Sequence, residues 1–217
     1  MRGFNYDEIH TGDDWKLILN SKTITPPEPK TYEVDIDGRD GTLDLSESLA
    51  GEIKFKDRTI TAVYLLTEGS RVERERLIRT ITNYLNGRKR KIVEPDDLDH
   101  YFIGRSKITA VSNNQAYGSI TVQSTCEPWR YSKDKISRYC QVNTSTPKKW
   151  VFTNDGARTA VPVITVTGFI TIVVGGVAHS LTAGSYRLTA LKFRSGVNEV
   201  SMYGSGSATF QYEEADL

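Results

Sequence analysis

The segment from Asp35 to Asp44 carries the densest group of side chains that could do chemistry in this 217-residue sequence. It reads Asp-Ile-Asp-Gly-Arg-Asp-Gly-Thr-Leu-Asp. Carboxylates two residues apart are the spacing with which a calcium-binding EF-hand loop begins. Counted from Asp35, however, such a loop needs Asp or Asn, Gly and Glu where this chain has Arg39, Asp40 and Ser46. We therefore interpret the segment as a charged surface turn.

A second acidic group, Asp96 to His100, combines three carboxylates with a histidine, as a metal or acid–base site could. Pro95 directly before it favours a turn. The three histidines, His10, His100 and His179, lie far apart and have no ligand spacing. We interpret this group as a solvated turn and not as a metal or catalytic site.

The known catalytic signatures are missing from the sequence. It contains no Walker phosphate loop, no zincin His-Glu-x-x-His and no Gly-x-Ser-x-Gly nucleophile elbow. Gly204-Ser205-Gly206 follows a strand pattern but opens no helix, so it is interpreted as a turn. The sequence predicts no catalytic residue, no cofactor and no metal, and hence a protein that is not an enzyme.

One dense run of basic residues allows two interpretations. The run Arg88 to Lys91 follows a predicted helix, where cations complement the helix dipole. A patch facing a neighbouring subunit or passing nucleic acid is the alternative, and the lack of interleaved aromatics disfavours it.

Trp15, Trp129 and Trp150 could stack on a sugar, although Trp129 lies at an expected domain seam, where burial is expected. A carbohydrate-binding module is therefore the second functional hypothesis.

Alternating patterns predict that strands position most of these residues. Residues 31–36 and 52–56 alternate apolar with charged side chains, which indicates half-buried strands. Residues 59–66 form a more continuous apolar run and are expected to be a central strand. Residues 106–111 and 119–126 flank a polar loop and predict a hairpin.

One amphipathic helix is predicted to lie on this sheet. Ser70 and Glu73 have the spacing of a capping box, and Gly87 supplies a left-handed stop. Apolar residues recur at helical spacing from Val72 to Leu85. The arginines are expected on the opposite, solvent side of the helix: Arg71, Arg74, Arg76 and Arg79.

The chain changes character after Pro128, which predicts two domains, residues 1–132 and 133–217. Residues 133–149 are polar and are expected to be a linker and a first strand. Beyond them, short strands separated by glycine turns, including Gly175-Gly176, predict a small antiparallel β-sandwich. The fold class is therefore mainly β with one prominent α-helix.

Composition excludes several partners. The net charge of +1 gives no global argument for nucleic acid or an anionic membrane. The longest apolar run, residues 169–178, falls short of the ~20 residues of a membrane helix, and the N-terminus lacks the apolar core of a signal peptide. Cys126 and Cys140 have no metal-ligand spacing and are expected to be reduced thiols, partly buried; a single bridge between them is the alternative.

In their order along the chain, these features resemble the distal tail proteins (Dit) of long-tailed bacteriophages. The resemblance spans nearly the whole sequence and includes a Gly-Arg-Asp-Gly turn followed by Leu-Asp, a helix ending Leu-Asn-Gly, and a Cys-Glu-Pro-Trp end to the first domain. The segments that carry it are 15–19, 25–27, 34–44, 54–60, 84–87, 96–104, 126–129, 195–200 and 210–212.

The resemblance implies a structural protein of the virion tail tip, assembled in the host bacterial cytoplasm. Its N-terminal domain would form a homo-hexameric ring around a channel that DNA crosses without specific binding. Its C-terminal domain would be galectin-like, without the sugar-binding constellation of galectins. The implied partners are the tail tube protein and tail-associated, tail fibre or receptor-binding proteins; a phage-derived tailocin-like particle would give the same sequence features.

In this family context the charged turn becomes a structural hypothesis. Its glycines are expected to provide tight-turn backbone between ring-wall strands. Its charged side chains are candidates for ion pairs that fix the corner or a subunit contact. The residues concerned are Gly38, Arg39, Asp40, Gly41, Asp44 and Arg58.

Overall fold

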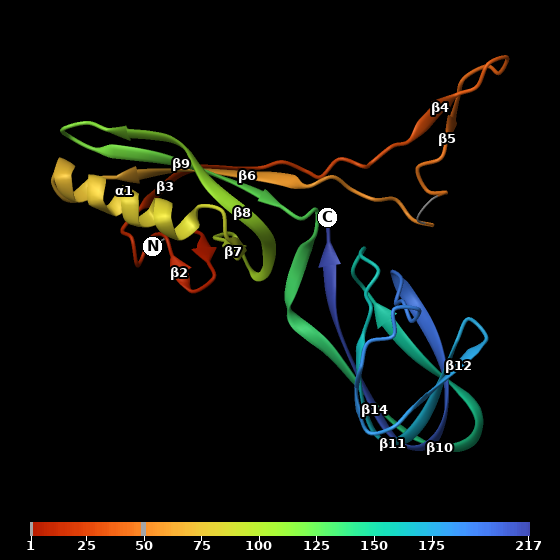
Figure 1. Ribbon diagram of the computed structural model, residues 1–217. Coiled ribbons are helices and arrows are strands. Elements are labelled where there is room, and N and C mark those ends of the chain that lie inside the picture. Colours follow the sequence, from red (N-terminus) through yellow and green to blue (C-terminus); the bar gives the residue numbers. More distant parts are fainter. Residues whose placement is uncertain (1, 49–50) are drawn as a thin grey trace. The chain divides into compact units, whose positions relative to one another are not determined.

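The computed structural model describes residues 2–48 and 51–217, and the chain divides into two compact units, residues 1–130 with 217 and residues 131–216. The predicted boundary lies two residues further along the chain. Unit 1 contains β1 (Asn5–Tyr6), β2 (Ile9–His10), β3 (Ile18–Ile24), β4 (Glu33–Asp35), β5 (Thr42–Asp44), β6 (Arg58–Leu66), α1 (Arg71–Leu85), β7 (Lys89–Glu94), β8 (Asp97–Asn113) and β9 (Gly118–Cys126). From Arg130 onward follow β10 (Arg130–Asn154), β11 (Val163–Val174), β12 (Val177–Leu181), β13 (Gly184–Tyr186) and β14 (Gly196–Asp216). The expected mainly β fold with one prominent helix is confirmed (Figure 1).

The sheet of unit 1 is built around β6, which pairs antiparallel with β3 on one side and β9 on the other. Buried and partly exposed residues alternate strictly along β6, from Arg58 to Leu66, because successive side chains of a strand point to opposite faces. Strands β8 and β9 form the predicted hairpin. The prediction of a central strand at residues 59–66 is confirmed.

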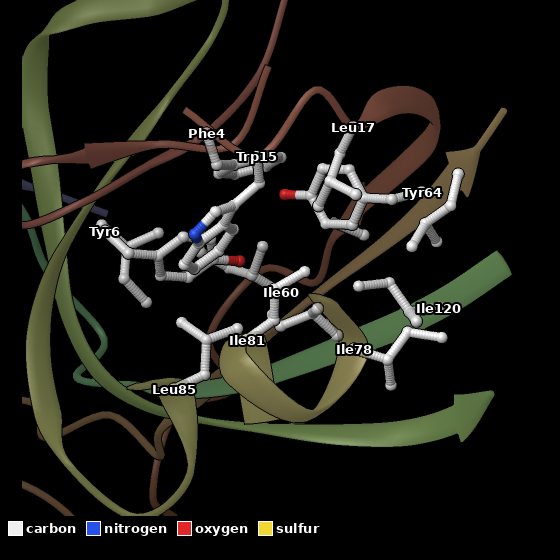
Figure 2. Packing of buried hydrophobic residues seen from close by; sticks show 14 of the residues in the cluster. Phe4, Tyr6, Trp15, Leu17, Ile60, Tyr64, Ile78, Ile81, Leu85 and Ile120 are labelled. Atoms are coloured by element: carbon white, nitrogen blue, oxygen red, sulfur yellow. The ribbon is translucent and has the colours of Figure 1, made fainter. Parts of the chain in front are cut away.

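Helix α1 covers one face of this sheet. Ser70 and Glu73 make both hydrogen bonds of the predicted capping box, and Gly87 just beyond the helix has a φ of 78°. Ile78, Ile81 and Leu85 are buried in the core of unit 1, together with aromatic residues of the N-terminal segment (Figure 2). The predicted helix is thus confirmed. In the described residues, no helix is long and apolar enough to cross a membrane.

Two residues of α1 lie on the side opposite to the one expected. Val72 is 62% exposed, whereas Arg74 is only 3% exposed. The Arg74 guanidinium donates from Nε to Asn113 Oδ1 at 3.1 Å, from Nη1 to the Gly69 carbonyl at 2.6 Å and from Nη2 to the Asn114 carbonyl at 2.6 Å. Arg74 therefore joins the helix start to the β8–β9 loop and is not a solvated cation.

Residues 28–56, which we call the arm, contain β4 and β5 as a separate two-stranded sheet (Figure 1). No residue of the arm is buried among those that the structure describes. Tyr32 is 55% exposed, and only a bridge at Phe55 remains of the strand expected at residues 52–56. The prediction of half-buried strands in this region is confirmed only in part: β4 lies within residues 31–36 and its Val34 is partly buried, whereas residues 52–56 form no strand.

Unit 2 contains an antiparallel sheet in the order β12-β11-β14-β10, with β13 pairing to β11. Its core includes Phe152, Phe193 and Phe210. Gly175 and Gly176, with φ of 55° and 81°, form the predicted hairpin turn between β11 and β12. The likeness of this unit to galectins stays a prediction.

Two segments of this half of the chain differ from expectation. Residues 133–149, expected to be a linker and a first strand, lie entirely within the continuous strand β10, whose polar side chains are mostly exposed while Cys140 and Val142 are buried. Gly204-Ser205-Gly206 is not a turn but part of β14. A Cβ at Gly206 would lie 2.1 Å from the Thr167 carbonyl oxygen, so glycine here permits close approach of β14 to β11.

Candidate functional site

The charged segment singled out by the sequence is the tip of the arm. Strands β4 and β5 pair with Val34 opposite Leu43, and the Arg39 amide donates to the Ile36 carbonyl at 3.1 Å to close the turn. Gly38 and Gly41 have φ of 83° and 75°, the left-handed region that favours glycine. The local structure of this tip therefore depends on its glycines.

Asp44 stabilises the base of this turn. Its carboxylate accepts hydrogen bonds from the Ser46 hydroxyl and from the Ser46 amide at 2.9 Å. These bonds, the hydroxyl first, hold the pKa of Asp44 below its usual value. The Arg39 and Asp40 side chains make no ion pair with any described residue, so both remain available at the tip.

Arg58 lies away from this tip, at the start of β6. It is 5% exposed, its guanidinium donates to the Pro128 carbonyl at 2.5 Å, and it lies 5.2 Å from the centroid of the Phe102 ring. The structure thus brings five of the six predicted residues to one turn but not Arg58. An ion pair from Arg58 that fixes the corner is therefore wrong, while the subunit-contact hypothesis remains a proposal.

The arm carries a local net negative charge that the spacing of its carboxylates does not reveal. Between Glu33 and Glu47 it carries six carboxylates and one guanidinium, Arg39, which gives this stretch a net charge of −5. Exposed apolar side chains, Tyr32 and Ile36, flank the carboxylates. The sequence shows this as a local excess of carboxylates, which the nearly neutral net charge of the whole chain conceals. Exposed apolar groups beside dense charge are typical of a protein–protein contact surface.

The second acidic group lies at the tight β7–β8 connection, where cations engage its carboxylates. Asp97 Oδ1 lies 2.8 Å from His100 Nδ1, and Asp97 Oδ2 lies 3.2 Å from Arg130 Nη1. Asp96 contacts Arg2 at 2.6 Å and Lys22 at 2.9 Å. The hydrogen bonds from Lys22 and Arg2 lower the pKa of Asp96. The carboxylates of Asp96 and Asp97 therefore serve structural ion pairs.

The basic run at residues 88–91 leads into strand β7 and does not form the end of the helix. Arg90 is buried: it contacts Asp7 at 2.6 Å, donates to the Tyr84 carbonyl at 2.6 Å and stacks 3.6 Å from the Tyr84 ring centroid. Lys89 pairs with Glu127. The run is therefore not a solvated helix end, although Arg90 does bind the C-terminus of α1 through the Tyr84 carbonyl.

The three tryptophans are engaged within the protein. Trp15 is buried edge-to-face against Tyr84 at 5.5 Å, and Trp129 packs edge-to-face on Phe55 at 5.6 Å. Trp150 packs partly buried against the core of unit 2. No described tryptophan ring therefore lies among the exposed large apolar side chains.

Cys126 and Cys140 are both buried and unbridged, one in each unit. Burial raises the pKa of the Cys126 thiol to about 12. A thiol with so high a pKa has almost no thiolate at neutral pH and is a poor nucleophile. The two cysteines are therefore packing residues.

Comparisons with known proteins identify the fold. No known family profile matches the sequence, and no curated protein matches it. Among solved structures, the chain is similar to the crystal structure of the SPP1 Dit protein (gp 19.1), with a TM-score of 0.74 and 13% sequence identity over 100% of both chains. That protein is described as a paradigm of the hub adsorption apparatus in phages that infect Gram-positive bacteria. The predicted likeness to distal tail proteins is therefore confirmed at the level of the fold.

Proposed function

We propose that this protein is a structural hub of a bacteriophage tail tip. The observation that carries the proposal is the similarity of fold over the full length of the SPP1 hub protein. A match that covers both chains completely supports a common plan for both units, and not only a shared domain. Because fold alone does not fix function, the arm and its charge add independent support for an assembly role.

The proposed assembly is a homo-hexameric ring that joins the tail tube protein to tail-associated, tail fibre or receptor-binding proteins. DNA would pass through its lumen without specific binding. A closed ring needs two different complementary surfaces on each subunit. An exposed hairpin such as the arm, none of whose described residues is buried, is suited to be one of them.

We propose no catalytic activity for this hub. Three of the side chains that could do chemistry are engaged within the protein: Asp44 binds Ser46, Asp97 binds His100, and Cys126 lies in the core. Carbohydrate binding by unit 2 is the alternative function, and the position of Trp150 against the core gives it no support.

The test of the hub role is the location of the protein in particles. Antibody-labelled particles viewed by electron microscopy should carry the label at the tail tip, after assembly in the host cytoplasm. Label on the capsid or along the tube, or its absence from purified particles, would refute the proposal. A phage-derived tailocin-like particle would give the same tail-tip label without a capsid.

Replacing Gly38 with valine should weaken self-association without unfolding the protein. A β-branched residue at a φ of 83° is strained by ~1–3 kcal/mol. A Cβ would meet nothing within 4 Å, so the effect acts through the backbone of the turn. The arm contributes no described residue to the core of unit 1, so the strained turn opens locally; sedimentation velocity should show weaker assembly while the melting temperature stays within ~2 °C. Gly38→Asn is the control, because asparagine tolerates this conformation; equal assembly of the valine variant would contradict the role of the tip.

A further inference from the structure

The outward side of helix α1 carries a group of arginines around an exposed valine. Arg71, Arg76 and Arg79 are exposed and, with Val72, Glu75 and Asn113, line a shallow hollow of 420 Å³. Val72 also lies on this side and, although it is apolar, is 62% exposed. We call Arg71, Val72, Arg76 and Arg79 the arginine face.

The guanidiniums of this face make no hydrogen bond or ion pair with a described residue. Glu75 is engaged by the Asn113 amide at 3.2 Å, and the Glu73 carboxylate caps the helix start by accepting from the Ser70 amide at 2.7 Å. Several other cations of unit 1 differ in this respect. Arg90 pairs with Asp7, Lys89 with Glu127 and Lys22 with Glu94, as do several more. Adjacent unpaired arginines with an apolar residue among them are suited to bind an anionic, partly apolar surface.

The same chain carries a surface with the complementary properties. The arm has a net charge of −5 between residues 33 and 47, and none of its carboxylates there forms an ion pair with a described residue. Tyr32 and Ile36 add exposed apolar area. Carboxylates unpaired along a narrow hairpin repel one another, and a cationic surface removes that repulsion.

We propose that the arm of one copy docks on the arginine face of a second copy. Arginine binds carboxylates through two parallel hydrogen bonds, and Val72 meets Tyr32 or Ile36 at the centre of the contact. Where one such contact joins each pair of copies, the arrangement is head-to-tail, which is the kind that closes into a ring. The inference rests on the proposed hub function and names the residues that join its subunits.

Charge reversal tests this contact in the full chain. Arg76→Glu with Arg79→Glu should weaken self-association by at least ~10-fold, and so should Asp37→Arg with Asp40→Arg. A mixture of the two variants should associate within ~3-fold of the unchanged protein, because each supplies the surface that the other has lost. Arg88→Glu is the matched control, since Arg88 is exposed on the same unit but outside the arginine face. Sedimentation velocity at low and high salt measures the self-association of each variant and of the mixture, and weaker association is expected at high salt.

Cross-linking provides a readout that does not depend on the strength of association. Arg76→Lys with Arg79→Lys retains the charge and places amines on the face, so that a carbodiimide can couple them directly to arm carboxylates. In a mixture of 14N- and 15N-labelled chains, mass spectrometry should detect heavy–light pairs that join residues 33–47 to α1.

The outcomes separate this contact from the hub role. Rings that form without these links, with unchanged association of the reversal variants, overturn the contact, and so does a chain that never self-associates. In both cases the label at the tail tip can still support the hub. Links between arm and helix in a protein absent from the tail tip would instead support the contact and refute the hub.

Discussion

Replacing Arg74 with methionine is expected to lower the free energy of unfolding of unit 1 by about 3 kcal/mol, because a buried hydrogen-bonding group left unpaired costs ~1–3 kcal/mol. The guanidinium donates to Asn113 Oδ1 and to the carbonyls of Gly69, Asn114 and Gln115. Methionine matches the length of the aliphatic stem but donates to none of them. The loss should thus come from unpaired polar groups and not from a cavity.

Urea unfolding followed by fluorescence measures this loss as a shift of the midpoint at an unchanged slope. Arg76→Met is the matched control: it makes the same change two residues along the same helix, at an exposed site, and should stay within ~0.5 kcal/mol. Equal effects at the two positions would show that the bonds from Arg74 contribute nothing to stability.

Arg74 also illustrates what could and could not be predicted from the sequence. The helix itself depends on local signals, the capping box of Ser70 and Glu73 and the stop at Gly87, and these were predicted correctly. A periodic pattern assigns every arginine to the solvent side. The burial of Arg74 depends instead on carbonyls of the β8–β9 loop about 40 residues away, which no local pattern contains.

The errors elsewhere have the same origin in long-range packing. Alternation at residues 31–36 reports which side chains share a face, but not how far that face is covered, and Tyr32 and Ile36 are 55% and 42% exposed. At residues 204–206, Gly206 permits close approach of β14 to Thr167. A glycine-rich segment of a strand and a turn cannot be distinguished by composition alone. For the candidate site, the turn glycines could be predicted because φ is local, whereas the position of Arg58 depends on its contacts with Pro128 and Phe102.

Replacing Phe210 with alanine should destabilise unit 2 by about 4 kcal/mol, within the range for large aromatic residues removed from a core. The Phe210 ring is fully buried and lies 4.7 Å from the Phe152 centroid and 6.3 Å from the Phe193 centroid. For a unit of this size, such a loss lowers the melting temperature by at least ~15 °C. Differential scanning calorimetry should show the shift in one transition. Phe169→Ala is the control, because Phe169 on the neighbouring strand β11 is 49% exposed and its removal leaves no cavity.

The Phe210→Ala variant also tests which unit forms the contacts of the ring. The arm and the arginine face both belong to unit 1, so loss of the Phe210 ring should leave self-association within ~3-fold of the unchanged protein below the new melting temperature. The charge-reversal variants should behave in the opposite way, with both transitions retained and association weakened by at least ~10-fold. If Phe210→Ala abolished assembly while unit 1 stayed folded, unit 2 would have to contribute a subunit contact, and the ring would need more than the arm and helix α1.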